Sequence, residues 1–174
     1  KLCLNENLSS EITVQPLRRF DIDAAIIFSD ILLVPFALGQ PVKFEKDFGP
    51  SLGEIDFNKM SNINEIQFTN KLKPVYNAIK KTKDKAELKN KDLIGFVGAP
   101  WTILIYMLNQ KSPKNENLGH ILEDQKFIED LLKVIVKFLK IHINNQIESG
   151  ATIIQIFDSW AGLLKEKDYD KYIY

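Results

Sequence analysis

The chain has 174 residues, about the length of one ordinary domain and enough to bury a sizeable hydrophobic core. Hydrophobic residues make up 45% of the sequence and charged residues 26%, which is typical of an ordered globular protein that is soluble in water. The 23 basic residues balance the 23 acidic residues, so the charge gives no support for binding to nucleic acid or to a membrane surface.

Cysteine content and the lengths of the apolar runs indicate the cellular setting. Cys3 is the single cysteine, so an internal disulfide is excluded and a reducing compartment, the cytoplasm, is expected. No apolar run approaches the roughly 18 to 20 residues that a membrane helix needs, and nothing resembles a signal peptide. We therefore expect a cytoplasmic protein that has no membrane partner.

The N-terminal part of the sequence predicts a helix and then a strand. The helix is expected over residues 8–19, where Pro16 predicts that it is short or kinked. The apolar run AAIIF, residues 24–28, predicts a buried strand. Gly-Gln-Pro and Phe-Gly-Pro turns then flank Val42 and Phe44, so we expect an excursion or a hairpin over one end of the sheet.

Two further helix–strand pairs follow along the chain. A helix over residues 72–89, with Val75 and Ile79 facing inward, precedes the run LIGFVG, residues 93–98. A long helix over residues 124–149 stops before Gly150 and precedes the run TIIQIF, residues 152–157. The inward stripe of the long helix consists of Ile128, Leu131, Leu132, Ile135, Phe138, Leu139 and His142. Apolar runs without alternation indicate parallel strands covered on both faces, and the pattern predicts a single α/β domain.

Each predicted strand ends in a small or polar cluster. Asp30 follows the first strand, GAPWT (98–102) ends the second, and DSWAG (158–162) follows the third. Sites in parallel α/β folds lie at the carboxyl ends of the strands, so the three clusters are expected around one pocket. Steps of two place Ile26 and Phe28 on the same strand face as Asp30. The same count places Phe157 with Ser159, which predicts flat apolar walls that suit a large, partly hydrophobic ligand.

The residues at these strand ends also have simpler interpretations. Asp30 is either the cap of a turn or helix, or a carboxylate placed to meet a ligand, and both interpretations stay open. For Asp158 we favour a structural cap, and Tyr106 by itself is typical of a core aromatic residue. His120 and His142 are expected to be structural or exposed, and with Cys3 they do not have the spacing of a zinc site.

Three longer strings are more specific than any single residue. The sequence resembles the uroporphyrinogen decarboxylase family in RRFDIDAAIIFSDILLVPFALG (18–39), LIGFVGAPWTILIYML (93–108) and GATIIQIFDSWAG (150–162). The resemblance implies a TIM-type (β/α)8 barrel, of which this chain covers about strands 2–4. Residues 1–174 are then part of a single barrel domain, the N-terminal half of a longer protein.

The resemblance also implies an activity. Members of this family are carboxy-lyases that convert the four acetate side chains of uroporphyrinogen III into methyl groups, giving coproporphyrinogen III in porphyrin and haem biosynthesis. They use no metal or organic cofactor, because the protonated pyrrole ring of the substrate accepts the electrons that carbon dioxide leaves behind. The implied partners are a tetrapyrrole substrate and, at full length, a second copy in a homodimer, with no nucleic acid or membrane.

The resemblance carries roles to particular residues. Asp30 matches the aspartate that binds the pyrrole N–H groups at the centre of the macrocycle, and Ile26 and Phe28 match residues that contact the rings. Tyr106 matches a tyrosine near the reacting acetate. Phe157, at the end of the third strand, matches a phenylalanine that packs against the rings. Ser159, just after that strand, matches a serine that binds a substrate carboxylate.

The family's remaining site residues have no counterpart in this sequence. Its carboxylate-binding arginines lie in an RQAGRY…R segment that would precede residue 1, and its functional histidine lies in the last barrel strand. Arg18 and Arg19 match arginines on the helix before strand 2, away from the pocket. We therefore expect the 174 residues alone to be inactive.

Two alternatives remain beside the decarboxylase hypothesis. One is a corrinoid- or thiol-dependent methyltransferase of the same superfamily, which would need zinc ligands from outside this sequence. The other is a half-barrel without catalytic activity that serves as a binding module.

Overall fold

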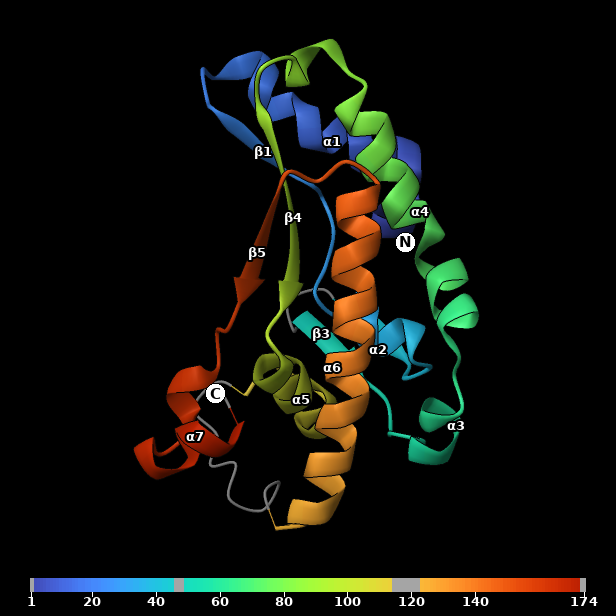
Figure 1. Ribbon diagram of the computed structural model, residues 1–174, viewed down its shortest axis with the longest axis vertical. Coiled ribbons are helices and arrows are strands. Elements are labelled where there is room, and N and C mark those ends of the chain that lie inside the picture. Colours follow the sequence, from blue (N-terminus) through green and yellow to red (C-terminus); the bar gives the residue numbers. More distant parts are fainter. Residues whose placement is uncertain (1, 46–48, 114–122, 173–174) are drawn as a thin grey trace.

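The centre of the fold is a three-stranded parallel sheet in the order β1-β4-β5 (Figure 1). The structure is a computed structural model and describes residues 2–45, 49–113 and 123–172. Strand β1 is Ala24–Ile26, β4 is Asp92–Gly98 and β5 is Ile153–Phe157. The predicted α/β fold with parallel strands is confirmed.

Three helices form a layer against this sheet, namely α1 (Glu6–Arg19), α4 (Glu65–Lys83) and α6 (Gln125–Glu148). The long helix is confirmed to within one residue at each end. Asp124 caps its start by accepting from the Phe127 N–H at 3.0 Å, and Gly150, at φ 111°, ends it. The inward stripe is also confirmed: Ile128, Leu131, Ile135, Phe138, Leu139 and His142 are buried, and Leu132 is half-buried.

The prediction for the second helix was wrong at both ends. Helix α4 begins at Glu65 rather than at residue 72, because Asn64 and Gln67 form a reciprocal capping box, with side-chain-to-backbone bonds of 2.9 and 3.0 Å. It ends at Lys83, and the short 3-10 helix η2 (Ala86–Leu88) leads into β4. Val75 and Ile79 face inward as predicted.

Strand β1 is two residues shorter than the predicted run 24–28. After Ile27 the chain leaves the sheet, and the N–H of Phe28 donates to Thr13 Oγ1 on α1 at 2.9 Å. Phe96 on β4 pairs with Gln155 on β5 but has no strand neighbour on the β1 side, where its backbone bonds instead to the side-chain amide of Gln146 on α6. The amide fits because residue 95 is glycine: a Cβ there would lie 2.5 Å from Gln146 Oε1.

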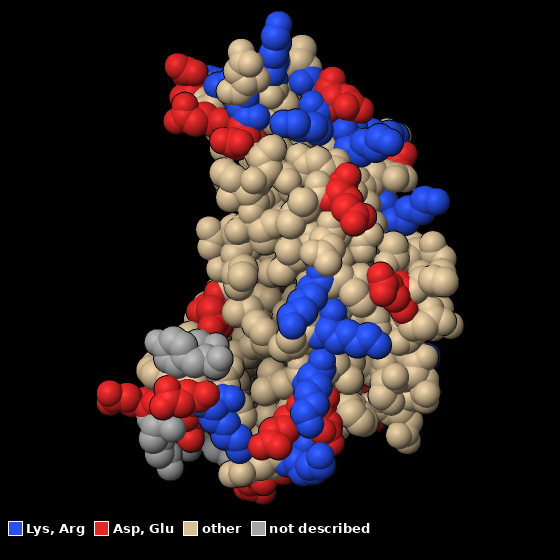
Figure 2. Space-filling view, viewed as in Figure 1, with Lys and Arg blue, Asp and Glu red and all other residues tan. Residues whose placement is uncertain are grey.

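The sheet is covered by helices on one face, which corrects the expectation that both faces are covered in this chain. Ala25, Leu93 and Val97 pack against the helix layer, whereas Ile26 is 50% exposed and Ile153 44% exposed on the opposite face. Helix α4 contacts both α1 and α6, and all three helices therefore lie on the same side. In the space-filling view the charged side chains are densest toward the two ends, and the uncharged surface between them lies mainly on the left of the view (Figure 2).

The remaining elements lie mostly beyond the carboxyl ends of the strands (Figure 1). They are α2 (Leu33–Ala37), the antiparallel pair β2 (Val42–Glu45) and β3 (Gly49–Leu52), α3 (Phe57–Ser61), α5 (Pro100–Asn109), η4 (Ala161–Leu163), η5 (Glu166–Asp168) and α7 (Tyr169–Tyr172), while η1 (Leu2–Leu4) begins the described chain. The predicted hairpin is confirmed by the register of β2 and β3. Among the described residues, no helix combines the length and the apolar character that a membrane span requires.

Candidate active site

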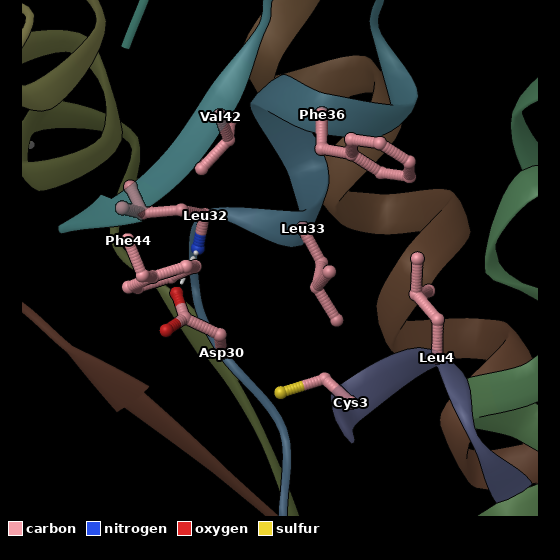
Figure 3. Close-up of a pocket in the computed structure, with 8 residues that line it drawn as sticks. All are labelled: Cys3, Leu4, Asp30, Leu32, Leu33, Phe36, Val42 and Phe44. Atoms are coloured by element: carbon pink, nitrogen blue, oxygen red, sulfur yellow. Dashed lines mark hydrogen bonds between the residues drawn. The ribbon is translucent and has the colours of Figure 1, made fainter. Parts of the chain in front are cut away.

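Asp30 lies in the turn that follows β1, where its carboxylate accepts a backbone hydrogen bond and also borders a cavity. One oxygen, Oδ1, accepts from the N–H of Leu32 at 2.8 Å and so holds the turn that leads into α2. The side chain also lines a cavity of about 170 Å³ (Figure 3). The other lining residues are Cys3, Leu4, Leu32, Leu33, Phe36, Val42 and Phe44. The turn-cap interpretation of Asp30 is confirmed, and the same carboxylate lies at a cavity, so its role toward a ligand stays a prediction.

The electrostatic environment of Asp30 is unusual for a carboxylate. Burial raises the pKa of Asp30, and the hydrogen bond from Leu32 opposes that shift in part. None of the ion pairs among the described residues includes Asp30, and no lysine or arginine lines its cavity. A carboxylate in apolar surroundings without a cationic partner would interact strongly with a positive charge that entered the cavity.

Cys3 lies in the same cavity but is not an activated nucleophile. Burial, followed by the negative charge of Asp30, raises the pKa of the Cys3 thiol. A raised pKa keeps the sulfur protonated at neutral pH, and the protonated thiol is a poor nucleophile. The neighbouring carboxylate of Asp30 is therefore the chemically distinctive group here.

The exposed face of the sheet supplies the apolar surface that strand alternation predicted. The register pairs Ile26 with Ile94 and Ile94 with Ile153, so the three side chains share that face. Phe157, at the end of β5, lies on the same face and packs edge-on against the ring of Phe96, with centroids 5.5 Å apart. This surface suits the flat apolar part of a ligand.

The segment after β5 is fixed by a structural aspartate, as favoured for Asp158. Thr102 Oγ1 on α5 donates to Asp158 Oδ1 at 2.7 Å and accepts from the N–H of Trp160 at 3.1 Å. Ser159 lies between these two bonded residues and is exposed. Tyr106 on α5 is half-buried, with its ring 6.0 Å from that of Trp160.

The predicted site residues do not all meet in one cavity. Asp30 is the one that lines the cavity of Figure 3, while Ile26 and Phe157 lie on the open sheet face. Phe28 is half-buried just beyond the end of β1. With Tyr106 and Ser159 on the segments that follow β4 and β5, the six residues are spread along the carboxyl-end edge. At about 170 Å³ the cavity is smaller than a usual ligand pocket.

His142, Arg18 and Arg19 lie away from the cavity of Asp30. His142 is buried in the helix layer, with Nδ1 3.0 Å from the hydroxyl oxygen of Tyr76, and is structural as predicted. His120 lies outside the described residues. Arg18 forms ion pairs with Glu11 and Glu87 at the surface of α1. Arg19 is exposed.

Sequence reasoning missed several cavity residues. Phe36 and Leu33 come from α2, and Val42 and Phe44 come from β2. The signal for the last two was present, since they are two residues apart on a predicted strand and so share one face. What the sequence could not show is that this face turns toward Asp30.

Comparison with known proteins gives a consistent assignment. The family model for "Uroporphyrinogen decarboxylase (URO-D)" matches residues 1–174. Among similar proteins are the uroporphyrinogen decarboxylases of Rickettsia bellii (strain RML369-C), 39% identical over 99% of this chain and 51% of that protein, and of Roseobacter denitrificans (strain ATCC 33942 / OCh 114), 40% identical over 98% and 51%. The chain thus spans about half the length of the curated relatives it matches.

A solved structure, a methyltransferase from Methanosarcina mazei, shares the fold with a TM-score of 0.78 at 17% identity. The match covers 98% of this chain and 51% of that one. Together the family and this neighbour imply an α/β fold of the TIM-barrel type. The chain belongs to the uroporphyrinogen decarboxylase family.

Proposed function

We propose that the protein decarboxylates the four acetate side chains of uroporphyrinogen III, giving coproporphyrinogen III, and that this chain supplies part of the active site. The observation that carries the proposal is the carboxylate of Asp30, which lies in an apolar cavity without a cationic partner. The family to which the chain belongs supports the choice of substrate. The exposed apolar sheet face, with Ile26 and Phe157, supports a flat ligand of macrocyclic size.

Decarboxylation needs an acceptor for the electron pair of the bond that breaks. In the proposed reaction a proton adds to a ring carbon of one pyrrole, and that ring becomes a cation. The bond between the acetate methylene and its carboxylate then breaks, carbon dioxide leaves, and the electron pair neutralises the ring. A second proton adds to the methylene carbon to form the methyl group, and the ring proton is released. Each acetate therefore consumes one proton and yields one carbon dioxide.

Asp30 would act on the charge that develops in this reaction. Its carboxylate would accept from the pyrrole N–H groups and stabilise the cationic ring. A fixed charge in apolar surroundings does this more strongly than water, because little reorganisation is needed and the local dielectric constant is low. The same burial that raises the pKa of Asp30 is what makes the carboxylate effective toward a cation.

The other predicted residues would bind and orient the substrate. Ile26, Phe28 and Phe157 would contact the pyrrole rings, which the exposure of Ile26 and the position of Phe157 at the end of β5 support. Tyr106 would lie near the reacting acetate, and Ser159, which is exposed, would donate to a substrate carboxylate. No metal or organic cofactor enters this scheme.

We further propose that residues 1–174 form part of one (β/α)8 barrel domain and contribute strands 2–4. The described sheet leaves one apolar face uncovered, and the lining of the Asp30 cavity has no cation for a substrate that carries eight carboxylates. For both reasons we propose that the 174 residues alone do not turn over substrate. The complete enzyme would be a cytoplasmic homodimer that binds neither nucleic acid nor membranes.

The test is product analysis with the protein expressed from its complete reading frame. Incubated with uroporphyrinogen III, it should release four equivalents of carbon dioxide and give coproporphyrinogen III without added metal or cofactor, whereas the 174-residue chain should give none. Metal analysis of the same protein separates the methyltransferase alternative, since that chemistry uses a zinc-bound thiol. Stoichiometric zinc together with no decarboxylation would contradict the proposal.

A further inference from the structure

Gln40 joins the hairpin of β2 and β3 to helix α5. Its side chain is 2% exposed, and Nε2 donates to the carbonyl of Gly53 at 2.8 Å and to the carbonyl of Met107 at 3.0 Å. Gly53 follows β3 directly, and Met107 lies in the last turn of α5. One buried amide therefore links the base of the hairpin to a helix that comes more than fifty residues later in the chain.

The side-chain amide of Gln40 is only partly satisfied by hydrogen bonds. Gln40 Oε1 has no hydrogen-bond partner among the described residues, so the side chain is not fully satisfied. Burying a polar group with an unpaired oxygen is unfavourable, and such groups persist where their other bonds fix a particular arrangement. A backbone bond from Leu52 N–H to the carbonyl of Gln110, at 2.7 Å, joins the end of β3 to the residue that follows α5.

The hairpin carries two side chains into the cavity of Asp30. Val42 and Phe44 alternate on β2 and so share one face, and both line that cavity (Figure 3). Phe44 is 59% exposed, so one side of its ring faces solvent while the other borders the cavity. Removing the ring would open the cavity to water on that side.

We infer that Gln40 is a positioning residue that holds the β2–β3 hairpin as one wall of the active site, and that Phe44 on this wall limits the access of water to Asp30. This inference rests on the proposed function for its catalytic meaning. The wall itself is a property of the 174-residue chain. Without the amide of Gln40, the hairpin would keep its own ladder but lose its side-chain link to α5.

Cys3 provides a direct probe of the wall. It is the single cysteine of the sequence, it is half-buried, and it lines the same cavity as Asp30 and Phe44. Its rate of reaction with a small aromatic disulfide reagent, measured in the 174-residue chain, reports how far the cavity is open. Because burial raises the pKa of the Cys3 thiol, opening the cavity should also move the pH profile of the reaction to lower pH.

Gln40→Met, which keeps the length of the side chain but removes both donors, should accelerate the reaction of Cys3 by at least about tenfold, as expected for local opening. Phe44→Ala should do the same, and both pH profiles should shift downward. Lys43→Ala is the matched control: Lys43 is exposed on the opposite face of the same strand, and the rate should not change. Reaction in urea gives the rate of the fully exposed thiol.

The inference is overturned if Cys3 reacts at wild-type rate in Gln40→Met or in Phe44→Ala, or if the folded wild-type chain reacts as fast as in urea. The activity of the complete protein is measured separately.

In the complete protein, Gln40→Met should shift the acid limb of the pH–rate profile to lower pH, because hydration lowers the raised pKa of Asp30. A protein without decarboxylase activity but with a protected Cys3 would contradict the proposed function and leave the wall intact.

Discussion

On the side of β4 where β1 has ended, the side-chain amide of Gln146 on α6 makes the two hydrogen bonds to the backbone of Phe96 that a strand would otherwise make. Its Oε1 accepts from the Phe96 N–H at 3.0 Å, and its Nε2 donates to the Phe96 carbonyl at 3.0 Å. These bonds satisfy the N–H and carbonyl of Phe96, which have no partner on β1 because the chain leaves the sheet after Ile27 and turns toward Asp30. The helix layer is thereby coupled to the point where β1 leaves the sheet for the site.

Gly95 should be essential to this arrangement. In Gly95→Ala the new Cβ would lie 2.5 Å from Gln146 Oε1, so the amide would move and Phe96 would lose its bonds. We expect a loss of about 1 to 3 kcal/mol in the free energy of unfolding, measured by urea denaturation. Gly162→Ala is the control, because a Cβ at Gly162 meets nothing within 4 Å. Equal stability of the two variants would contradict this role of Gln146.

His142 should make the fold sensitive to acid. Its burial lowers the pKa of the imidazole from 6.5 to about 4, so the folded state disfavours the proton that the unfolded state binds. Stability is then fully present above about pH 6.5 and falls as the pH drops toward 4, by at most about 3 kcal/mol.

The variant that isolates this effect is His142→Gln, which keeps a polar partner for the hydroxyl of Tyr76 but does not titrate. Urea denaturation of both proteins at pH 7 and pH 5 should show a smaller loss in the variant. A wild-type stability that does not change between these two pH values would contradict the assignment of His142 as a buried neutral residue.

Thr102 should position the segment that carries Ser159. Thr102→Val removes the donor to Asp158 Oδ1 and the acceptor for the Trp160 N–H, and should lower the free energy of unfolding by about 1 to 3 kcal/mol. Asp158→Asn keeps an oxygen that can accept from Thr102, so it should be close to wild type in thermal stability. If Asp158→Asn were as damaging as Thr102→Val, the charge of Asp158 would have a role beyond this bond.

The sequence predicted best the features that depend on local patterns. The ends of α6 follow from Asp124 and Gly150, and the confirmed hairpin follows from its two flanking turns. The start of α4 was also encoded locally, in the capping box of Asn64 and Gln67, but the prediction did not use that signal.

Features that depend on distant residues were not predictable in the same way. Where β1 ends early, the backbone of Phe96 bonds to Gln146, a residue more than a hundred positions later than β1. The cavity wall of Val42 and Phe44 depends on how Gln40 fixes the hairpin against α5. For Asp30 the sequence left two roles open. The structure shows that its carboxylate both caps the turn at Leu32 and borders a cavity.

We propose that the charge of Asp30 serves catalysis rather than folding, and the kinetics of Asp30→Asn in the complete protein distinguish the two roles. Asparagine keeps the oxygen that accepts from Leu32 N–H and removes a buried charge, so thermal stability at neutral pH should be equal to wild type or higher. The turnover of uroporphyrinogen should fall by about 100-fold or more, as when a preorganised electrostatic group is removed. A folded Asp30→Asn enzyme with wild-type turnover would contradict the claim.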